Sequence, residues 1–239
     1  AEGITDLILD LRFNNGGSVE LARYLAASIA GTSHRSDVFM KMQRSSGADE
    51  YIRFGDGDDL NLNSVRIICS EETASASELI INGLRGIDFP VKLFGSRTEG
   101  KNVGMEVQEY KYGNKYYEFA PITFRSFNAK DWGDYADGID PDVMLNNQNS
   151  SYEDDIDNVF PYAFGDWDNF DFNYPLYWAL CDVQGVDPTT GEPVKRSGRS
   201  GMTRSQQDEI IRVPSVPLKR PVGTFGSLIY NKPEVENLY

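Results

Sequence analysis

The sequence predicts an α/β fold in which the sheet is largely parallel. Two buried strands each run into a turn that contains glycine or serine and then into an apolar-striped helix, and the two units follow one another along the chain. Strands that alternate with helices in this way are typical of parallel sheets covered by helices. The 239 residues, 40% hydrophobic and 25% charged, suit a globular protein with a sizeable core.

The first unit starts with residues 4–11, an apolar run rich in branched side chains that predicts a buried strand. The sequence Asn-Asn-Gly-Gly at 14–17 ends it with turn chemistry. Ser18 is a suitable N-cap for the helix that follows, and Gly31 suits the end of that helix. The apolar stripe of this helix is formed by Leu21, Ala22, Leu25, Ala26 and Ile29.

The second unit follows a polar interval. Residues 65–69 predict a second buried strand, residues 75–85 a second helix and residues 91–94 a third strand. If the first two strands are adjacent and parallel, the turn at 14–17 and the start of the second helix open at the same edge of the sheet. Ligands bind at this edge in such folds.

Beyond Lys101 the pattern changes. Residues 107–110 and 116–119 flank Tyr-Gly-Asn and predict a β-hairpin, and a turn at 138–143 leads into another short strand. We therefore expect a core over residues 1–145 and an extension over 146–239 that packs on it.

The extension has less regular patterning. Acidic and aromatic residues alternate through residues 154–171 with no persistent period, and residues 187–205 have the composition of a mobile loop. A group of aromatic residues is expected to pack the extension onto the core, namely Trp167, Phe170, Phe172, Tyr174, Tyr177 and Trp178.

Composition disfavours several classes of function. A net charge of −14 disfavours nucleic-acid binding, and no apolar run reaches the about 18 residues of a membrane span. Cys69 and Cys181 do not make a disulfide framework, although one bridge between them stays open. The aspartates at 154, 155 and 157 lack the glycine and terminal glutamate of an EF-hand loop, so no metal is expected.

Two polar residues carry the chemistry. Ser75 starts an apolar helix and Lys101 lies in a glycine-flanked turn. Because His34 is the single histidine, the sequence offers little support for a catalytic mechanism based on histidine. A serine hydroxyl and a desolvated lysine amine can form a nucleophile and its base. Taken alone, Ser75 is an ordinary N-cap and Lys101 an ordinary surface lysine.

Main-chain amides complete the predicted site. The amide of Ala76, together with one from Gly16 or Gly17, would form an oxyanion hole for acyl transfer. Ser77 is a rival nucleophile, but on a helix it points away from Ser75.

Four segments resemble the tail-specific, or C-terminal processing, serine peptidases, and they occur in the order of that family over roughly residues 4–145. They are DLRFNNGG at 10–17, TASASE at 73–78, GSRTEGKNVG at 95–104 and DGIDPDV at 137–143. The resemblance implies a ClpP/crotonase-like core that cleaves peptide bonds with a Ser–Lys dyad, in which Ser75 is the nucleophile and Lys101 the base. It also implies a protein or peptide substrate and no cofactor.

The same resemblance implies a bacterial protein in the periplasm or at the outer membrane, with a lipid anchor possible. Relatives commonly carry a PDZ domain before this core, so we expect the sequence to be a mature or excised fragment of a longer protein, in which the lack of a targeting signal is uninformative.

One departure from the family pattern lies four residues after Lys101. Members with a Ser–Lys–Gln triad carry a glutamine four residues after the lysine, and here that residue is Met105. Glu78 is a candidate supporting group, although an acid in the first helical turn is also favoured by the helix dipole alone.

Met105 keeps a second hypothesis open, a peptidase-fold module that binds peptides or ligands without turnover. A third hypothesis, an acyl-CoA-processing crotonase relative, would use a similar oxyanion hole but lacks a basic patch for the CoA phosphates.

Overall fold

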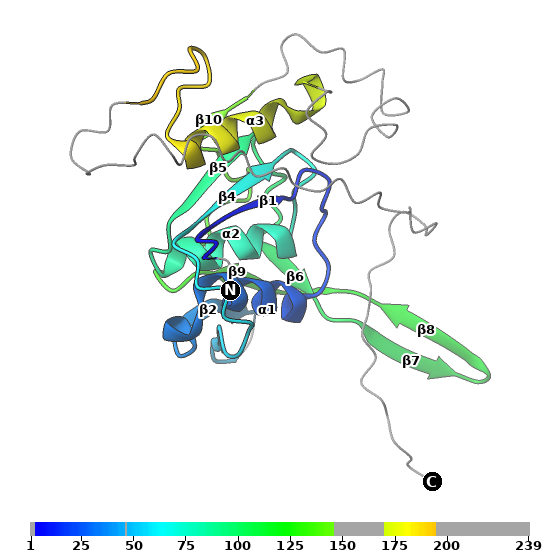
Figure 1. Cartoon of the computed structure of the whole chain (residues 1–239). Coiled ribbons are helices and arrows are strands. Elements are labelled where there is room, and N and C mark those ends of the chain that lie inside the picture. The colour runs from blue at the N-terminus through cyan, green and yellow to red at the C-terminus, as the bar shows by residue number, and fades with distance from the viewer. Residues whose placement is uncertain (1–2, 46, 146–169, 195–239) are drawn as a thin grey trace. The chain divides into compact units, whose positions relative to one another are not determined.

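The computed structural model describes residues 3–45, 47–145 and 170–194 (Figure 1). The chain divides into two compact units, one containing the described residues up to Met144 and one beginning at Leu145. Packing of the extension on the core stays a prediction, and the aspartates at 154, 155 and 157, like Trp167, lie outside the described residues. None of the described helices has the length and hydropathy that a membrane span requires.

The first sheet is parallel, as the sequence predicts. Its strand order is β1-β4-β5-β10, and each neighbouring pair is parallel. The register places Asp6 beside Ser64 and Asp10 beside Ile68, so the first two strands of the sequence are adjacent. The strands are β1 (Asp6–Asp10), β4 (Ser64–Cys69), β5 (Val91–Gly95) and β10 (Val143–Met144).

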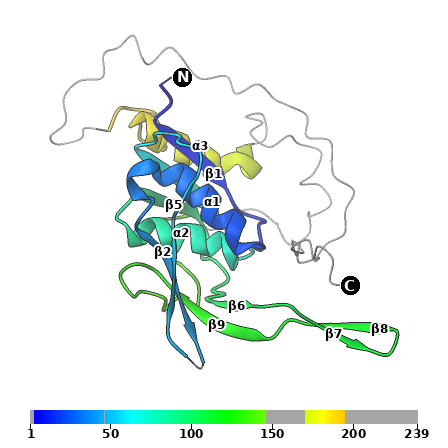
Figure 2. The same ribbon diagram turned by 90° about the horizontal axis from the view of Figure 1, so that it is seen from below.

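Two helices, α1 (Val19–Ala30) and α2 (Ala76–Gly86), lie side by side along this sheet (Figure 2). Ser18 caps α1 as predicted, because its hydroxyl accepts a hydrogen bond from the amide of Leu21 at 3.3 Å. Leu21 itself is 69% exposed, whereas Ile29 is fully buried. The predicted apolar stripe is therefore wrong at Leu21, which lies on the solvent side of the helix.

The structure contains a second, antiparallel sheet that the sequence analysis missed. Its order is β3-β2-β9-β6, formed by β2 (Val38–Arg44), β3 (Glu50–Arg53), β6 (Val103–Met105) and β9 (Ile122–Phe127). Phe39 of β2 packs against Gly83 of α2, where an added Cβ would lie 2.5 Å from the phenylalanine ring. The interval before residue 64 is thus not merely polar. A bulge near Met40 breaks the alternation that identifies a strand.

The predicted hairpin is present as β7 (Gln108–Tyr112) and β8 (Lys115–Phe119), each longer toward the turn than expected. It continues from the strands β6 and β9 and stands away from the rest of the first unit (Figures 1 and 2). Every residue of both strands is exposed.

The second unit contains a helix, α3 (Phe170–Gln184), with Pro175 inside it. The helix starts where the sequence analysis found no persistent period, so that expectation is wrong for its first residues. The mobile loop expected from residue 187 is wrong over the described part, because Val186 bridges Pro193 and the amide of Asp187 donates to the carbonyl of Glu192 at 2.8 Å.

The two cysteines are both buried and free, so the bridge between them that the sequence left open is not formed. Burial raises the pKa of the Cys69 thiol to about 12. This thiol is therefore an apolar core group and has little thiolate character.

Truncation on the two faces of α1 should have unequal effects. Ile29→Ala leaves a cavity in the core and should lower the free energy of unfolding by about 2–5 kcal/mol. Leu21→Ala removes a side chain of similar size from the exposed face and should change it by less than about 0.5 kcal/mol. Denaturant unfolding measures both. Equal losses would contradict the described orientation of the helix.

Candidate active site

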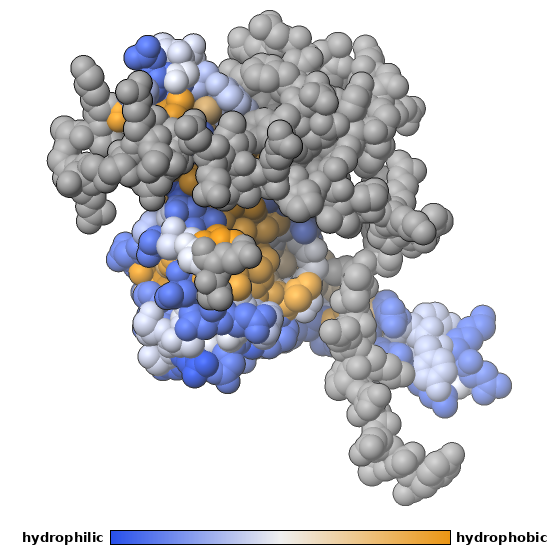
Figure 3. Space-filling model, in the orientation of Figure 1, coloured by the Kyte–Doolittle hydropathy of each residue, from blue (hydrophilic) through white to orange (hydrophobic). Residues whose placement is uncertain are grey.

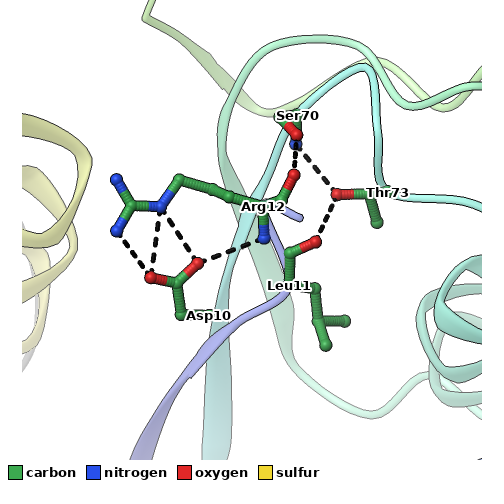
Figure 4. A network of polar contacts seen from close by, with 5 residues as sticks. All are labelled: Asp10, Leu11, Arg12, Ser70 and Thr73. Carbon is green, nitrogen blue, oxygen red and sulfur yellow. Dashed lines mark hydrogen bonds and ion pairs between the residues drawn. The ribbon is translucent and has the colours of Figure 1, made fainter. Parts of the chain in front are cut away.

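The loop that leads to α2 is tied to the end of β1 by a buried threonine (Figure 4). The Thr73 hydroxyl donates to the Leu11 carbonyl at 2.7 Å and accepts from the Ser70 amide at 2.9 Å. The Ser70 hydroxyl donates to the carbonyl of Arg12, whose guanidinium is paired with the carboxylate that ends β1. These contacts fix the first helical turn of α2 beside the turn that follows β1.

Ser75 has an unusual backbone conformation just before α2. Its φ of 56° and ψ of −116° lie in a region that residues with a side chain rarely adopt. Such a conformation costs about 1–3 kcal/mol and persists only where its surroundings impose it. A strained turn between strand and helix is also how other hydrolase folds expose a nucleophilic serine.

Glu78 imposes this conformation from the first turn of α2. Its side chain is fully buried, and its carboxylate accepts four hydrogen bonds. One oxygen, Oε2, accepts from the main-chain amides of Ser75 at 2.7 Å and Lys101 at 2.9 Å. The other, Oε1, accepts from the Thr98 hydroxyl at 2.6 Å and the Gly100 amide at 2.8 Å.

The shared oxygen brings two distant parts of the chain together. The main-chain amides of Ser75 and Lys101 both donate to one carboxylate oxygen, so the two residues lie close together at this point. The interpretation of Glu78 as a first-turn acid is correct but incomplete. Glu78 does lie in the first turn of α2, but its carboxylate also connects the main chain of Ser75 to that of Lys101.

The loop around Lys101 is also held from its other side. The carbonyl of Asn102 accepts from the Ser126 amide at 2.9 Å and from the Ser126 hydroxyl at 3.1 Å. Because this hydroxyl donates to Asn102, its contact of 2.8 Å with the buried Tyr135 hydroxyl must be one in which Tyr135 donates. Gly100 fits because its φ is 99° and a Cβ there would lie 2.4 Å from the amide nitrogen of Gly138.

The side chain of Lys101 is half-buried. Among the residues that the structure describes, it has no carboxylate partner, although the chain is rich in acids. Met105, four residues on, lies in β6 opposite Ile122 and offers no polar atom that could replace glutamine.

The turn after β1 reaches the start of α2. At Gly16 an added Cβ would lie 2.7 Å from the Ala76 nitrogen and 2.9 Å from the Ser75 Cβ, and the φ of 95° favours glycine there. The side-chain oxygen of Asn14 accepts from the Gly16 amide at 3.0 Å and from the Ser77 hydroxyl at 2.9 Å. Both groups are thereby occupied.

The amides of Ala76 and Gly17 differ from that of Gly16. Within the described part of the chain, neither has a hydrogen-bond acceptor. The predicted site residues from the three segments thus meet at one edge of the parallel sheet. The single histidine, His34, lies in the short helix η1 (Thr32–His34) and pairs with Asp37 at 2.7 Å.

Sequence reasoning missed Thr73, Asn14, Ser126 and Tyr135, which hold these groups in place. Thr73 and Asn14 lie within two of the segments quoted above, but the partners Leu11 and Ser77 are 62 and 63 residues away from them. Ser126 and Tyr135 lie outside those segments. No group of three or more His, Cys, Asp or Glu side chains that could hold a metal ion occurs in the described residues.

Comparison with known proteins shows the family of the chain. The model of peptidase family S41 matches residues 1–145. The chain belongs to peptidase family S41. The resemblance to C-terminal processing peptidases is therefore confirmed, and so is the α/β fold class.

Individual relatives are distant. The chain is 27% identical over 170 residues to a probable CtpA-like serine protease of Staphylococcus aureus, covering 70% of this chain and 32% of the relative. A protein of the same description from Staphylococcus haemolyticus is 26% identical over 147 residues, covering 60% and 28%. The chain thus spans about a third of the length of these relatives.

A solved structure shares the fold. The crystal structure of a putative S41 protease from Bacteroides fragilis superimposes with a TM-score of 0.61 at 24% identity, covering 77% of this chain and 46% of that one.

Removing one charge from the carboxylate bridge should disturb both halves of the site. Glu78→Gln puts an amide donor where two of the four donors now point, so it should lower the free energy of unfolding by about 2–5 kcal/mol. Glu72→Gln, at an exposed position of the preceding loop, is the matched control and should be neutral. Denaturant unfolding of both variants gives the comparison. A neutral Glu78→Gln would show that the bridge does not stabilise the fold.

Alkaline pH should destabilise the fold through Tyr135. Burial raises the pKa of its hydroxyl from 10.0 to about 12. Above pH 10 the phenol of the unfolded chain therefore loses a proton that the folded chain keeps, and the free energy of unfolding falls as pH rises toward about 12.

Tyr135→Phe should remove this component, giving a shallower fall of the free energy of unfolding with pH. Tyr110→Phe, at an exposed tyrosine, should keep the wild-type slope. Identical slopes in wild type and Tyr135→Phe would refute the assignment.

Proposed function

We propose that the chain is the catalytic portion of a serine endopeptidase that hydrolyses peptide bonds of protein substrates through a Ser75–Lys101 dyad. The observation that carries the proposal is the carboxylate of Glu78, which binds the main chains of both residues through one oxygen atom. A bridge of this kind gives two residues of opposite catalytic role a fixed mutual position, which intramolecular proton transfer requires.

In the proposed reaction the Ser75 Oγ attacks the carbonyl carbon of the scissile bond while the Lys101 amine takes the hydroxyl proton. The tetrahedral intermediate expels the amine of the leaving fragment, which receives that proton from the lysine ammonium. Water then attacks the Ser75 ester, giving its proton to Lys101. The lysine returns a proton to the serine oxygen as the acid product leaves.

The surroundings of Lys101 support its role as the base. A base must be able to reach the hydroxyl whose proton it takes, and an ion pair with a carboxylate would hold the amine elsewhere. Lys101 is half-buried and has no carboxylate partner among the described residues.

For the oxyanion hole we propose the amides of Ala76 and Gly17. Both are without an acceptor in the described part of the chain, whereas the Gly16 amide already donates to Asn14. Gly16 then has a different role. Its missing side chain lets the turn approach Ser75 closely.

Ser75 is also favoured over Ser77 as the nucleophile. The Ser77 side chain is buried and its hydroxyl donates to Asn14. A hydroxyl held in this way is not available to a substrate carbonyl.

Further expectations rest on family membership. They are a location outside the cytoplasm, in the periplasm or at the outer membrane, and a substrate-selecting region such as a PDZ domain in the longer protein. No cofactor takes part in the proposed reaction.

Met105 favours a second candidate function, a peptidase-fold module that binds peptides without cleaving them. The residue occupies the position of a supporting glutamine, and its side chain cannot hydrogen-bond a lysine amine in that way.

Labelling with a fluorophosphonate separates the two functions. The wild-type protein should be labelled and should cleave a fluorogenic unfolded protein. Ser75→Ala should abolish labelling, and Lys101→Met should lower turnover by about 10²–10⁴-fold with an unchanged melting temperature. Ser77→Ala is the matched control and should keep the label. A folded wild type that binds peptide but neither labels nor cleaves would establish the binding module.

A further inference from the structure

The hairpin formed by β7 and β8 has two chemically different faces. Paired residues of an antiparallel hairpin share a face, so the register assigns each side chain to one side. One side, here called the aromatic face, carries Gln108, Tyr110, Tyr112, Lys115, Tyr117 and Phe119. The opposite side carries Glu109, Lys111, Tyr116 and Glu118.

The aromatic face is uncovered. Tyr110 is 69% exposed, Tyr112 80%, Tyr117 44% and Phe119 56%. The hairpin stands away from the first unit in the space-filling view, where it is blue to pale because the tyrosine hydroxyl gives that residue an intermediate hydropathy (Figure 3). Four exposed rings on one face of an isolated two-stranded ribbon are unusual, since such a ribbon is at best marginally stable without a partner layer.

The opposite face is suited to water. Glu109 and Glu118 lie directly across from each other, and covering two like charges would add a desolvation cost to their repulsion. Lys111 lies over the ring of Tyr116 with 5.2 Å between its amine and the ring centre. Any partner layer therefore belongs on the aromatic face.

We propose that the aromatic face is a self-association surface on which a second copy of this chain places the same face. Charge is the first argument for this occupant. The chain has a net charge of −14, so two copies repel at most surfaces, but residues 108–119 contain two glutamates and two lysines and are locally neutral. Lys115 is the only charged residue on the aromatic face. A basic peptide finds no acid there, whereas a second copy brings the same aromatic rings to the same rings.

Geometry and area are the second argument. A face-to-face pair of hairpins is isologous, so the tyrosine rings of one copy meet those of the other in stacked or edge-to-face contacts. With their present exposures, four aromatic side chains offer about 400–600 Å² per copy. This is less than the about 800 Å² per partner of a standard stable interface, so the dimer should be weak and reversible.

Sedimentation velocity of the full chain tests the proposal over about 1–100 μM, the range in which a small interface dissociates. The wild type should shift from monomer toward dimer as concentration rises. A Tyr110→Ser, Tyr117→Ser double variant, which removes a cross-strand pair from the middle of the aromatic face, should remain monomeric. Tyr116→Ser, which changes the opposite face, is the matched control and should associate like the wild type.

Thermal unfolding checks that the variants fold, and the hairpin lies outside the core, so their melting temperatures should match that of the wild type. A wild type that stays monomeric overturns the proposal, as does a double variant that still dimerises. A monomeric wild type that binds fluorescein-labelled unfolded casein through Tyr110 and Tyr117 would assign the face to polypeptide docking instead. None of these readouts depends on peptidase activity.

Discussion

The candidate site depends on the buried carboxylate of Glu78, which joins the start of α2 to the loop around Lys101. Removing a carboxylate from water costs several kcal/mol unless hydrogen bonds replace its hydration. Here four donors do so, three of them main-chain amides, and the N-terminus of α2 adds its partial positive charge. The same contacts offset the backbone strain at Ser75. The hydrogen bonds that stabilise the buried charge of Glu78 thus also fix the main chains of two candidate catalytic residues.

The parallel sheet explains why these segments can meet. β1, β4 and β5 are neighbours and run in one direction, so the turn that contains Gly16, the start of α2 and the loop of Lys101 leave the sheet at a common edge. The strand–turn–helix pattern predicted this edge from the sequence, because apolar runs and glycine turns are local signals. The same signals located Ser75, Ala76 and Lys101.

What the sequence could not supply is non-local. Three of the four partners of Glu78 lie 20 to 23 residues away, and only the register of β4 and β5 brings them within reach. The second sheet was missed because a bulge between Val38 and Met40 breaks the alternation of apolar and polar residues at the start of β2. Tyr135 lies in a polar loop, and nothing local marks it as a buried hydrogen-bond donor.

Met105 is easier to understand against this background. In the residue pattern of relatives, a glutamine side chain four positions after the lysine can steady the amine directly. Here the main chain around Lys101 is held on one side by Glu78 and on the other by Ser126, which Tyr135 supports in turn. Main-chain anchors limit the positions that a side chain can reach, because they fix the Cα from which it starts. The methionine at residue 105 therefore supplies no polar restraint on the lysine, and the backbone restraints remain in place.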